Sequence, residues 1–259
     1  VSTSGYSSNQ SLAVQSSFGK KSGTATIDEF DDASLEKVVR RAEELANLSP
    51  ENSEFMEPLG PQMYDESISF SESTASISPE YRAEVASSSI VPAAAKDVTA
   101  AGFLNDSAGF SAMINSKGLF AYNKSTNVDF TVTMRTNDGT GSGWVSRDFN
   151  DVAKFDADEA AKTTIDKAVM SREAKAIEPG KYTVILEPAA SSDLLRNMFR
   201  SLDARSADEG RSFMSAADGA NKLGEKIVDE RVSIWSDPLN PEVPTATWNG
   251  EGQPLKKTT

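Results

Sequence analysis

The chain has 259 residues, of which 38% are hydrophobic and 25% are charged, so it can bury a core and global disorder is disfavoured. Its 26 basic and 39 acidic residues give a net charge of −13, which argues against DNA or an anionic membrane as the main partner. The absence of cysteine and histidine excludes disulfides, zinc sites of the usual kind and a Ser-His-Asp triad. The chemistry that remains possible is a metal site built from carboxylate oxygens, catalysis by paired carboxylates or by a Ser-Lys pair, or no catalysis at all.

The first region predicts a β-hairpin followed by a helix. Weak apolar alternation is broken at Gly19 and Gly23, which favours a hairpin that turns between these two glycines. Residues 31–50 then carry apolar side chains at helical spacing, with Asp31 or Asp32 placed to cap the start and a proline to stop the end.

A second helix is expected after a connecting segment. Residues 51–77 are polar and show no period, which is typical of a linker. Ser78 and Pro79 have the residue types of an N-cap and a first helical position, and Pro92 should end or kink the helix that they open.

The texture changes from Thr99, where short alternating runs predict an antiparallel meander. A helix should follow, with Asp156 as its cap and Glu159 at the third position, as in a capping box. Four turn signals divide the meander, at residues 105–109, 115–118, 123–127 and 137–143.

The last third predicts a buried strand, a helix, a strand pair and a loop-rich end. The stretch EPGKYTVILEP, residues 178–188, reads as a turn and a continuous apolar strand at 181–187. Residues 224–238 read as two further strands. Between them lies a helix that should pack on a sheet through one apolar face, formed by Leu194, Leu195, Met198, Phe199 and Leu202. The separation of helices from antiparallel strands indicates an α+β fold.

Several stretches could carry chemistry, and each has a simpler structural interpretation. The glycine-rich residues 137–144 could cradle a phosphate, but they lack the Lys-Ser/Thr of a P-loop and fit a hairpin turn better. Carboxylates cluster at residues 156–159 and at Asp208 and Glu209, where a helix cap and a polar loop are favoured over a metal or acid–base site. Residues 191–193, Ser-Ser-Asp, read as an N-cap.

The three tryptophans, Trp144, Trp235 and Trp248, could form a ligand platform, but single tryptophans in sheets more often lie in a core or an interface.

The order of several weak motifs resembles the TldD/PmbA family of metalloproteases, once described as modulators of DNA gyrase. The resemblance lies in "GKYTVILEPAASSDLLRNMFRSLDARSADEGRSFMS", "GEKIVDERVSIWSDP" and "GEGQPLKKTT", with "FGKKSGTATIDEFDDASLEKVVRRAEELA" and "TMRTNDGTGSGW" before them. Family members are longer at both ends. The resemblance therefore implies an incomplete N-terminal domain at residues 1–50, a linker at 51–77, a middle α+β domain at 78–178 and the start of a β-rich C-terminal domain at 179–259.

One kind of subunit in this family carries an HExxxH helix whose histidines bind a metal, and the other kind (PmbA or TldE) lacks it. Aligned here, Arg196 stands at the first histidine, Asn197 at the glutamate and Ser201 at the second histidine. None can serve, because arginine has no free lone pair, asparagine is no base and serine is a poor zinc ligand. The resemblance thus implies a PmbA-like chain without a metal or catalytic residues of its own.

The resemblance also implies a homodimer, or a heterodimer with a TldD-like HExxxH subunit that holds a zinc-type metal and takes unfolded peptide. Arg196 and Arg200 could then attract acidic groups of a peptide, although pairing with nearby carboxylates such as Asp203 is favoured. Rival interpretations are a hydrolase using carboxylate or serine chemistry and a stand-alone peptide-binding or regulatory module. Direct DNA binding is disfavoured by the charge.

No apolar run approaches the roughly 20 residues that a membrane span needs, and the first residues lack the pattern of a signal peptide. We therefore expect a soluble cytoplasmic protein with no membrane partner.

Overall fold

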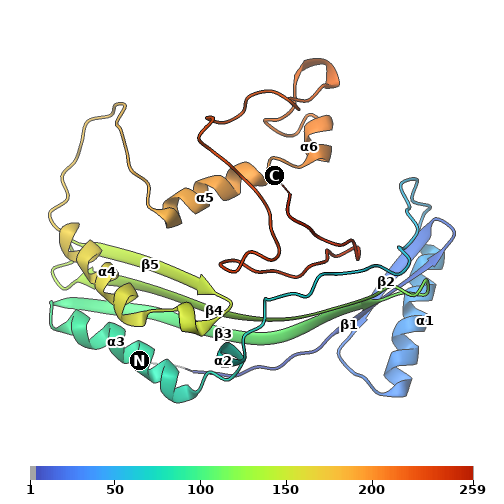
Figure 1. The fold of residues 1–259 in the computed structure, drawn as a ribbon, viewed down its shortest axis with the longest axis horizontal. Coiled ribbons are helices and arrows are strands. Elements are labelled where there is room, and N and C mark those ends of the chain that lie inside the picture. Colours follow the sequence, from blue (N-terminus) through green and yellow to red (C-terminus); the bar gives the residue numbers. More distant parts are fainter. Residues whose placement is uncertain (1–3, 259) are drawn as a thin grey trace. The chain divides into compact units, whose positions relative to one another are not determined.

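The computed structural model describes residues 4–258. They fall into two compact units that meet between Pro58 and Leu59, within the predicted linker. The first unit holds a hairpin and one helix, and the second holds a three-stranded sheet, its covering helices and the C-terminal region (Figure 1).

The first unit confirms the predicted hairpin and helix. Strands β1 (Leu12–Phe18) and β2 (Lys21–Ile27) are joined by a two-residue turn that begins at Gly19, whose φ of +59° suits glycine. The second predicted turn glycine, Gly23, instead lies inside β2. A Cβ there would lie 2.2 Å from the backbone nitrogen of Ala46, so this glycine lets the helix approach the strand.

Helix α1 (Asp32–Leu48) covers the hairpin and begins where the sequence predicts. The Asp31 carboxylate accepts a hydrogen bond from the Ser34 amide at 3.0 Å, and its bonds to Ser34 lower the pKa of Asp31. The buried apolar side chains of α1 share one face of the helix: Val38, Ala42 and Ala46.

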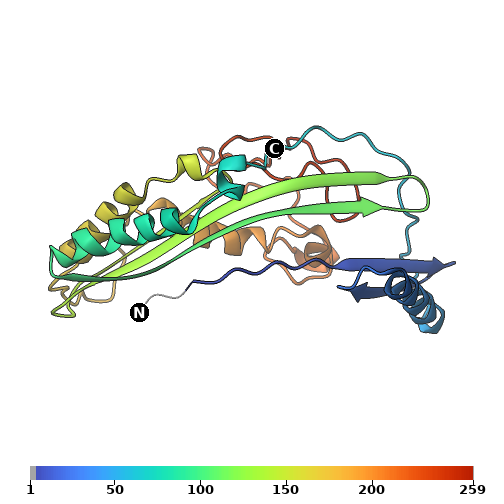
Figure 2. The ribbon, with the colours of Figure 1, turned by 90° about the horizontal axis from the view of Figure 1, so that it is seen from below.

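The second unit is built on an antiparallel sheet in the order β3 (Val98–Ile114), β4 (Phe120–Thr136), β5 (Ser142–Phe149). Helices α3 (Pro79–Ala94) and α4 (Ala157–Met170) cover one face of this sheet (Figure 2). The core lies between these two layers and includes Val85, Phe130, Val132, Met134, Val145 and Ile165.

Two of the four predicted turns in the meander are wrong. Strands β3 and β4 pair along 17 residues without a break, from Val98 opposite Thr136 to Ile114 opposite Phe120. Residues 105–109 pair with residues 125–129, so both predicted turns, 105–109 and 123–127, lie within the ladder. Their Asn, Asp, Ser and Gly residues favour turns locally, but the long register of cross-strand pairs overrides this preference.

The caps of α3 and α4 are confirmed. Ser78 accepts from the Tyr81 amide at 3.2 Å, and Asp156 accepts from the Glu159 amide at 2.9 Å. Helix α3 passes through Pro92 and ends two residues later. The capping box is half formed, because the Glu159 carboxylate bonds Arg147 instead of reaching back to the cap.

The segment before α3 runs beside the outer edge of β4. The Thr126 amide donates to the Ser69 carbonyl at 3.0 Å, and the Ser69 hydroxyl donates to the Lys124 carbonyl at 2.8 Å. The short helix α2 (Glu72–Ala75) follows and is anchored by buried Thr74, whose hydroxyl donates to the Asn150 carbonyl at 3.0 Å. A 3₁₀ turn, η1 (Val152–Lys154), leads into α4.

The C-terminal region departs most from the sequence-based expectation. The predicted strand at residues 181–187 and the strand pair at 224–238 are absent, and all residues from 171 to 188 are exposed. A strand needs a neighbouring strand to satisfy its backbone groups, and no described residue supplies one for the apolar run. The regular elements here are α5 (Pro188–Phe199), α6 (Ala204–Asp208) and the 3₁₀ turn η2 (Ala217–Gly219).

Residues 238–258, called the strap below, return to the sheet as the predicted loop-rich end. The Thr247 hydroxyl donates to the Asp65 carbonyl at 2.7 Å, and the Tyr64 hydroxyl donates to the Gly252 carbonyl at 2.7 Å. A Cβ on Gly252 would lie 2.7 Å from a methyl group of buried Leu119. The strap therefore packs against the end of the sheet where β3 turns into β4.

The architecture confirms the predicted α+β class, since the sheets are antiparallel and the helices lie outside them. Among residues 4–258, no helix is long and apolar enough to cross a membrane.

Candidate functional site

Helix α5 carries the positions aligned with a metal-binding motif, and it begins earlier than predicted. Its first residue is Pro188, with Glu187 at the N-cap position and no side-chain cap. The Ser-Ser-Asp stretch at residues 191–193 consequently lies inside the helix, which corrects its interpretation as an N-cap. Proline suits a first helical position because its missing N–H would have no intrahelical acceptor.

The three aligned residues lie at or just beyond the C-terminal end of α5, and each contacts residues close to it in the sequence. Arg196 lies 3.8 Å from the Asp193 carboxylate, and the Asn197 amide donates to the Asp193 carbonyl at 3.0 Å. Ser201 lies beyond the last helical residue, and its carbonyl accepts from the Ser212 hydroxyl. Ser201 is therefore outside the helix that carries Arg196 and Asn197.

These residues do not fit a zinc ion. The guanidinium of Arg196 and the amide nitrogen of Asn197 are donors already directed at Asp193, and neither offers a lone pair to a cation. The Ser201 hydroxyl and the Asn197 side-chain carbonyl are the oxygens in the set, and both are neutral, poor zinc ligands. Zinc sites are built from histidine, cysteine and carboxylate ligands, usually three or four of them, and none of these three residues is of that kind. No catalytic step through a metal follows from this helix.

Asp203, the acid expected to pair with the two arginines, has a structural role instead. Arg196 has the Asp193 carboxylate nearby, whereas Asp203, the acid named in the simpler interpretation, caps α6 by accepting from the Ser206 amide at 2.7 Å. These hydrogen bonds with Ser206 lower the pKa of Asp203. Arg196 and Arg200 are both exposed.

The apolar face of α5 is exposed, contrary to the expectation that it packs on a sheet. No residue of the helix is buried, and Leu194 is 63% exposed. The expected packing surface included the strand at 181–187, which is not formed. Amphipathic spacing predicted the helix correctly but cannot identify the surface that covers it.

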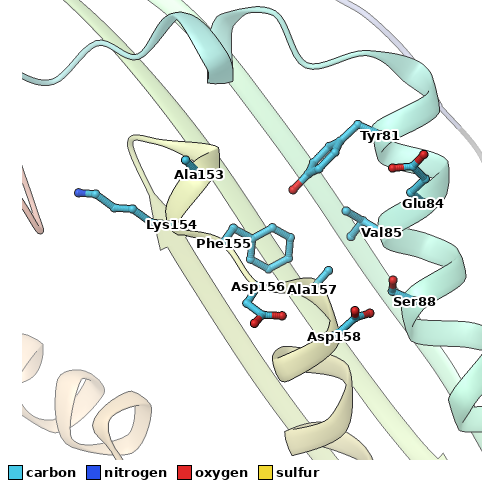
Figure 3. Close-up of a pocket in the computed structure, with 10 residues that line it drawn as sticks. All are labelled: Tyr81, Glu84, Val85, Ser88, Ala153, Lys154, Phe155, Asp156, Ala157 and Asp158. Atoms are coloured by element: carbon cyan, nitrogen blue, oxygen red, sulfur yellow. The ribbon is translucent and has the colours of Figure 1, made fainter.

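A separate cavity of about 390 Å³ lies between α3 and the start of α4 (Figure 3). Tyr81 and Phe155 provide its aromatic lining, and Glu84, Asp156 and Asp158 provide carboxylates. Burial raises the pKa of Tyr81, and the nearby Glu84 carboxylate raises it further. Lys154 also lines the cavity, but its ammonium group donates to the Asn150 side chain and to the Pro241 carbonyl. The remaining lining suits a positively charged or hydrogen-bond-donating group.

This cavity was missed at the level of sequence. Tyr81 and Glu84 are three residues apart on α3, but the residues opposite them come from the start of α4, more than 70 positions later. Asp156 is already occupied as the cap of α4. The cavity brings together acidic groups and a phenol but no pair of groups linked as acid and base.

The glycine-rich stretch is a hairpin turn, as favoured from its sequence. Asp138 accepts hydrogen bonds from the Thr136 hydroxyl at 2.6 Å and the Thr140 amide at 3.0 Å, which lower the pKa of Asp138 to about 2. A Cβ on Gly141 would lie 2.1 Å from the Ala168 carbonyl oxygen. This glycine therefore serves the packing of α4.

The other carboxylate candidates serve structural roles. Glu209 follows α6 and is held by Arg205, at 2.8 Å, and by Arg211, while Asp208 accepts from the Asn221 amide at 2.8 Å. Within residues 4–258, no group of three or more acidic side chains is arranged to hold a metal.

The tryptophans do not form a shared platform. Trp144 lies on β5, whereas Trp235 and Trp248 lie in irregular segments, and Lys257 lies 5.9 Å from the Trp235 ring. The close ring pairs in the described part of the chain are Phe110 with Tyr122 and Phe130 with Phe155.

Two family models match the chain. Residues 64–172 match the PmbA/TldA metallopeptidase central domain, and residues 179–259 match the PmbA/TldA metallopeptidase C-terminal domain. A search of curated proteins found no match.

Solved structures share the fold. A putative modulator of DNA gyrase from Thermotoga maritima superposes with a TM-score of 0.84 at 20% identity, and TldE from Thermococcus kodakarensis with 0.78 at 17%. A putative modulator of DNA gyrase from Bacteroides thetaiotaomicron gives 0.77 at 17%. The first two matches cover 96% of this chain and 57% of each relative, and the third covers 96% and 58%. The chain thus spans less than two thirds of their length.

The antiparallel sheet, its two covering helices and the domain that follows define a metallopeptidase-like α+β protein. The chain belongs to the PmbA/TldD family.

Proposed function

We propose that this chain is a non-catalytic, TldE-like subunit of a PmbA/TldD-type metallopeptidase that degrades or processes unfolded peptides. The observation that carries the proposal is the occupation of the aligned motif by Arg196, Asn197 and Ser201 in a sequence without histidine or cysteine. A subunit of this kind would rely on a partner for zinc and for the activated water. The partner would be a subunit with an HExxxH helix, in the cytoplasm.

The experiment is reconstitution. The full-length protein is purified alone and together with an HExxxH-bearing homologue, and zinc content and cleavage of an unfolded peptide are measured for each. We expect stoichiometric zinc and cleavage that chelator abolishes only when the homologue is present. Stoichiometric zinc with chelator-sensitive cleavage in the chain alone would contradict the proposal.

A second measurement addresses the exposed arginines of α5. If Arg196 and Arg200 contact acidic groups of a peptide in the complex, changing both to glutamine should raise KM for an acidic peptide and leave KM for its amidated counterpart unchanged. Arg231→Gln is the matched control. Arg231 is an exposed arginine that lies outside α5, where it pairs with Asp229. Equal KM changes for both peptides would remove the charge-based role.

A further inference from the structure

In the described part of the chain, the three-stranded sheet has one long edge without a partner. Strand β4 pairs with β3 along its whole length, and its other side is occupied first by β5 and then by the segment around Ser69. Within residues 4–258, no backbone hydrogen bond joins the outer edge of β3 to another segment. Every second residue of an antiparallel edge strand directs its N–H and C=O outward, so β3 presents a row of unsatisfied groups.

The first part of β3 packs into the core through Val98, Ala100 and Leu104. Residues 107–114 lie beyond this packing and are called the free part of the edge below. All residues from 107 to 112 are exposed, on both faces of the strand. Natural edge strands are usually protected by lysine, proline or a bulge, and β3 has no lysine, no proline and an unbroken register. Its one charged residue, Asp106, lies before the free part and is held by Arg82 through bonds of 2.7 and 2.9 Å.

The same part of the sheet has one covered face and one bare apolar face. Ala121 and Asn123 point to the covered side, where Asn123 lies against Ser69 and the strap packs on Leu119. The opposite face carries four large side chains between 48% and 74% exposed: Phe110, Ile114, Phe120 and Tyr122. The rings of Phe110 and Tyr122 stack with their centroids 6.0 Å apart.

The two glycines of β3, Gly102 and Gly109, differ in whether the space beside them would admit a side chain. A Cβ on Gly102 would lie 2.7 Å from the Thr131 carbonyl oxygen, so that glycine is needed within the sheet. A Cβ on Gly109 would meet nothing within 4 Å. Glycine inside a strand weakens it and often marks a place where another backbone approaches closely. Packing within the chain therefore does not require a glycine at position 109, which lies in the free part of the edge.

We propose that the outer edge of β3 at residues 107–114 binds an extended peptide as an additional strand. Backbone N–H and C=O groups would hold the peptide largely independently of its sequence. Alternate peptide side chains would fall beside Phe110 and Ile114 on the bare face, so the preferred peptide has apolar residues at every second position.

A single strand fits this edge better than a second copy of the chain. Eight residues is the length of one ordinary strand. Pairing two such edges would bury a few hundred Å², whereas a stable interface needs on the order of 1,000 Å² or more. The binding needs no metal-bearing partner and so goes beyond the proposed function.

The test uses the full-length protein and a labelled eight-residue peptide of alternating valine and threonine, flanked by lysine. The comparison peptide has the same side chains but N-methyl groups at every second amide, which removes donors along one edge. Fluorescence anisotropy should show saturable binding of the first peptide and at least tenfold weaker binding of the second. Hydrogen exchange with the first peptide bound should protect residues 107–114.

Two proline variants identify the groups involved. In Ala108→Pro and Gly109→Pro, consecutive residues lose N–H groups that point to opposite edges, so one variant keeps the ladder to β4 and loses only an outward donor. The variant that retains wild-type circular dichroism and thermal unfolding should bind at least tenfold more weakly. Phe103 lies outside the free part and is about as exposed as Phe110, so the Phe103→Ser variant should bind the peptide as tightly as the wild type.

Four outcomes would overturn the proposal. The first is equal binding of the two peptides, and the second is no binding of either. The third is peptide-dependent protection outside residues 107–114. The fourth is a concentration-dependent dimer that protects this edge without peptide, which would assign the edge to a second copy. Because the assay contains this chain alone, its failure would leave the reconstitution result unaffected.

Discussion

Asp129 and Asp148 face one another across β4 and β5, on the face of the sheet away from the helices. Burial raises the pKa of Asp129, and the neighbouring Asp148 carboxylate raises it further. Asn127 partly offsets the repulsion between the two carboxylates, because its side-chain amide donates a hydrogen bond to Asp148 at 2.7 Å. Like charges placed directly opposite in a sheet are destabilising.

Asp129→Asn should therefore stabilise the protein at neutral pH. A carboxyl whose pKa is raised in the folded state favours folding below its unfolded pKa, and this benefit is lost as the pH rises through the folded value. The free energy of unfolding of the variant should exceed that of the wild type at pH 7. The difference should shrink as the pH falls to about 4, as measured by urea denaturation.

Asp138→Asn is the matched control with the opposite sign. Its folded pKa of about 2 lies below the unfolded value, so the carboxylate stabilises the fold above about pH 4 and loses this effect as the pH falls. The variant should be less stable than wild type at pH 7. A stability loss in Asp129→Asn at pH 7 would show that Asp129 makes favourable contacts that outweigh the repulsion.

Glycines in the sheet provide a second residue-scale prediction. A Cβ on Gly143 would lie 2.3 Å from the Thr164 carbonyl oxygen in α4, so Gly143→Ala must push the helix away and should lower the free energy of unfolding by about 1–3 kcal/mol. Gly109→Ala adds a methyl group in open space and should leave stability unchanged or raise it by up to about 1 kcal/mol. Thermal and urea unfolding measure both variants. An equal loss of stability in Gly143→Ala and Gly109→Ala would contradict the packing argument.

At the scale of elements, β4 is the centre of the second unit. Met134 on this strand is fully buried among the side chains of α3, α4 and β5, whereas Met170 at the end of α4 is 85% exposed. Met134→Ala should cost about 2–5 kcal/mol of unfolding free energy, because the cavity cannot close between two packed layers. Met170→Ala should stay within about 0.5 kcal/mol. If urea denaturation gave similar losses of unfolding free energy for Met134→Ala and Met170→Ala, Met134 would not be a core residue.

The elements could be predicted from the sequence where local signals and tertiary packing agree. Asp31, Ser78 and Asp156 cap their helices as expected, because an N-cap bond depends on residues three positions apart. Asn105 and Gly109 favour turns but lie in a strand, because their partners in β4 are 16 to 24 positions away. Residues 181–187 have strand composition but no strand to pair with.

The candidate site was predictable only in part. The positions of Arg196 and Asn197 on a helix followed from amphipathic spacing, and their poor fit to a zinc ion followed from their chemistry. That Ser201 lies beyond the helix end, and that Tyr81 lines a cavity with Asp158, depends on where helices stop and meet. Neither is encoded in a short local pattern.

At the scale of the whole molecule, residues 171–188 form an exposed connection between α4 and α5. Trypsin should cut after Lys175 and Lys181 well before it cuts after Lys162, which lies within α4 and is paired with Asp166. Mass spectrometry of a time course would identify the first fragments. Initial cleavage within α4 would mean that the connection is protected and the helix is not.

The strap has a consequence for the order of folding. Its contacts join residues about 180 positions apart, such as Thr247 with the Asp65 carbonyl and Tyr64 with the Gly252 carbonyl. A few hydrogen bonds of about 1 kcal/mol each cannot offset the chain entropy of closing so long a loop in an unfolded chain. The sheet must form first and bring these segments near one another. We therefore expect the strap to dock after the sheet and to detach before the sheet unfolds.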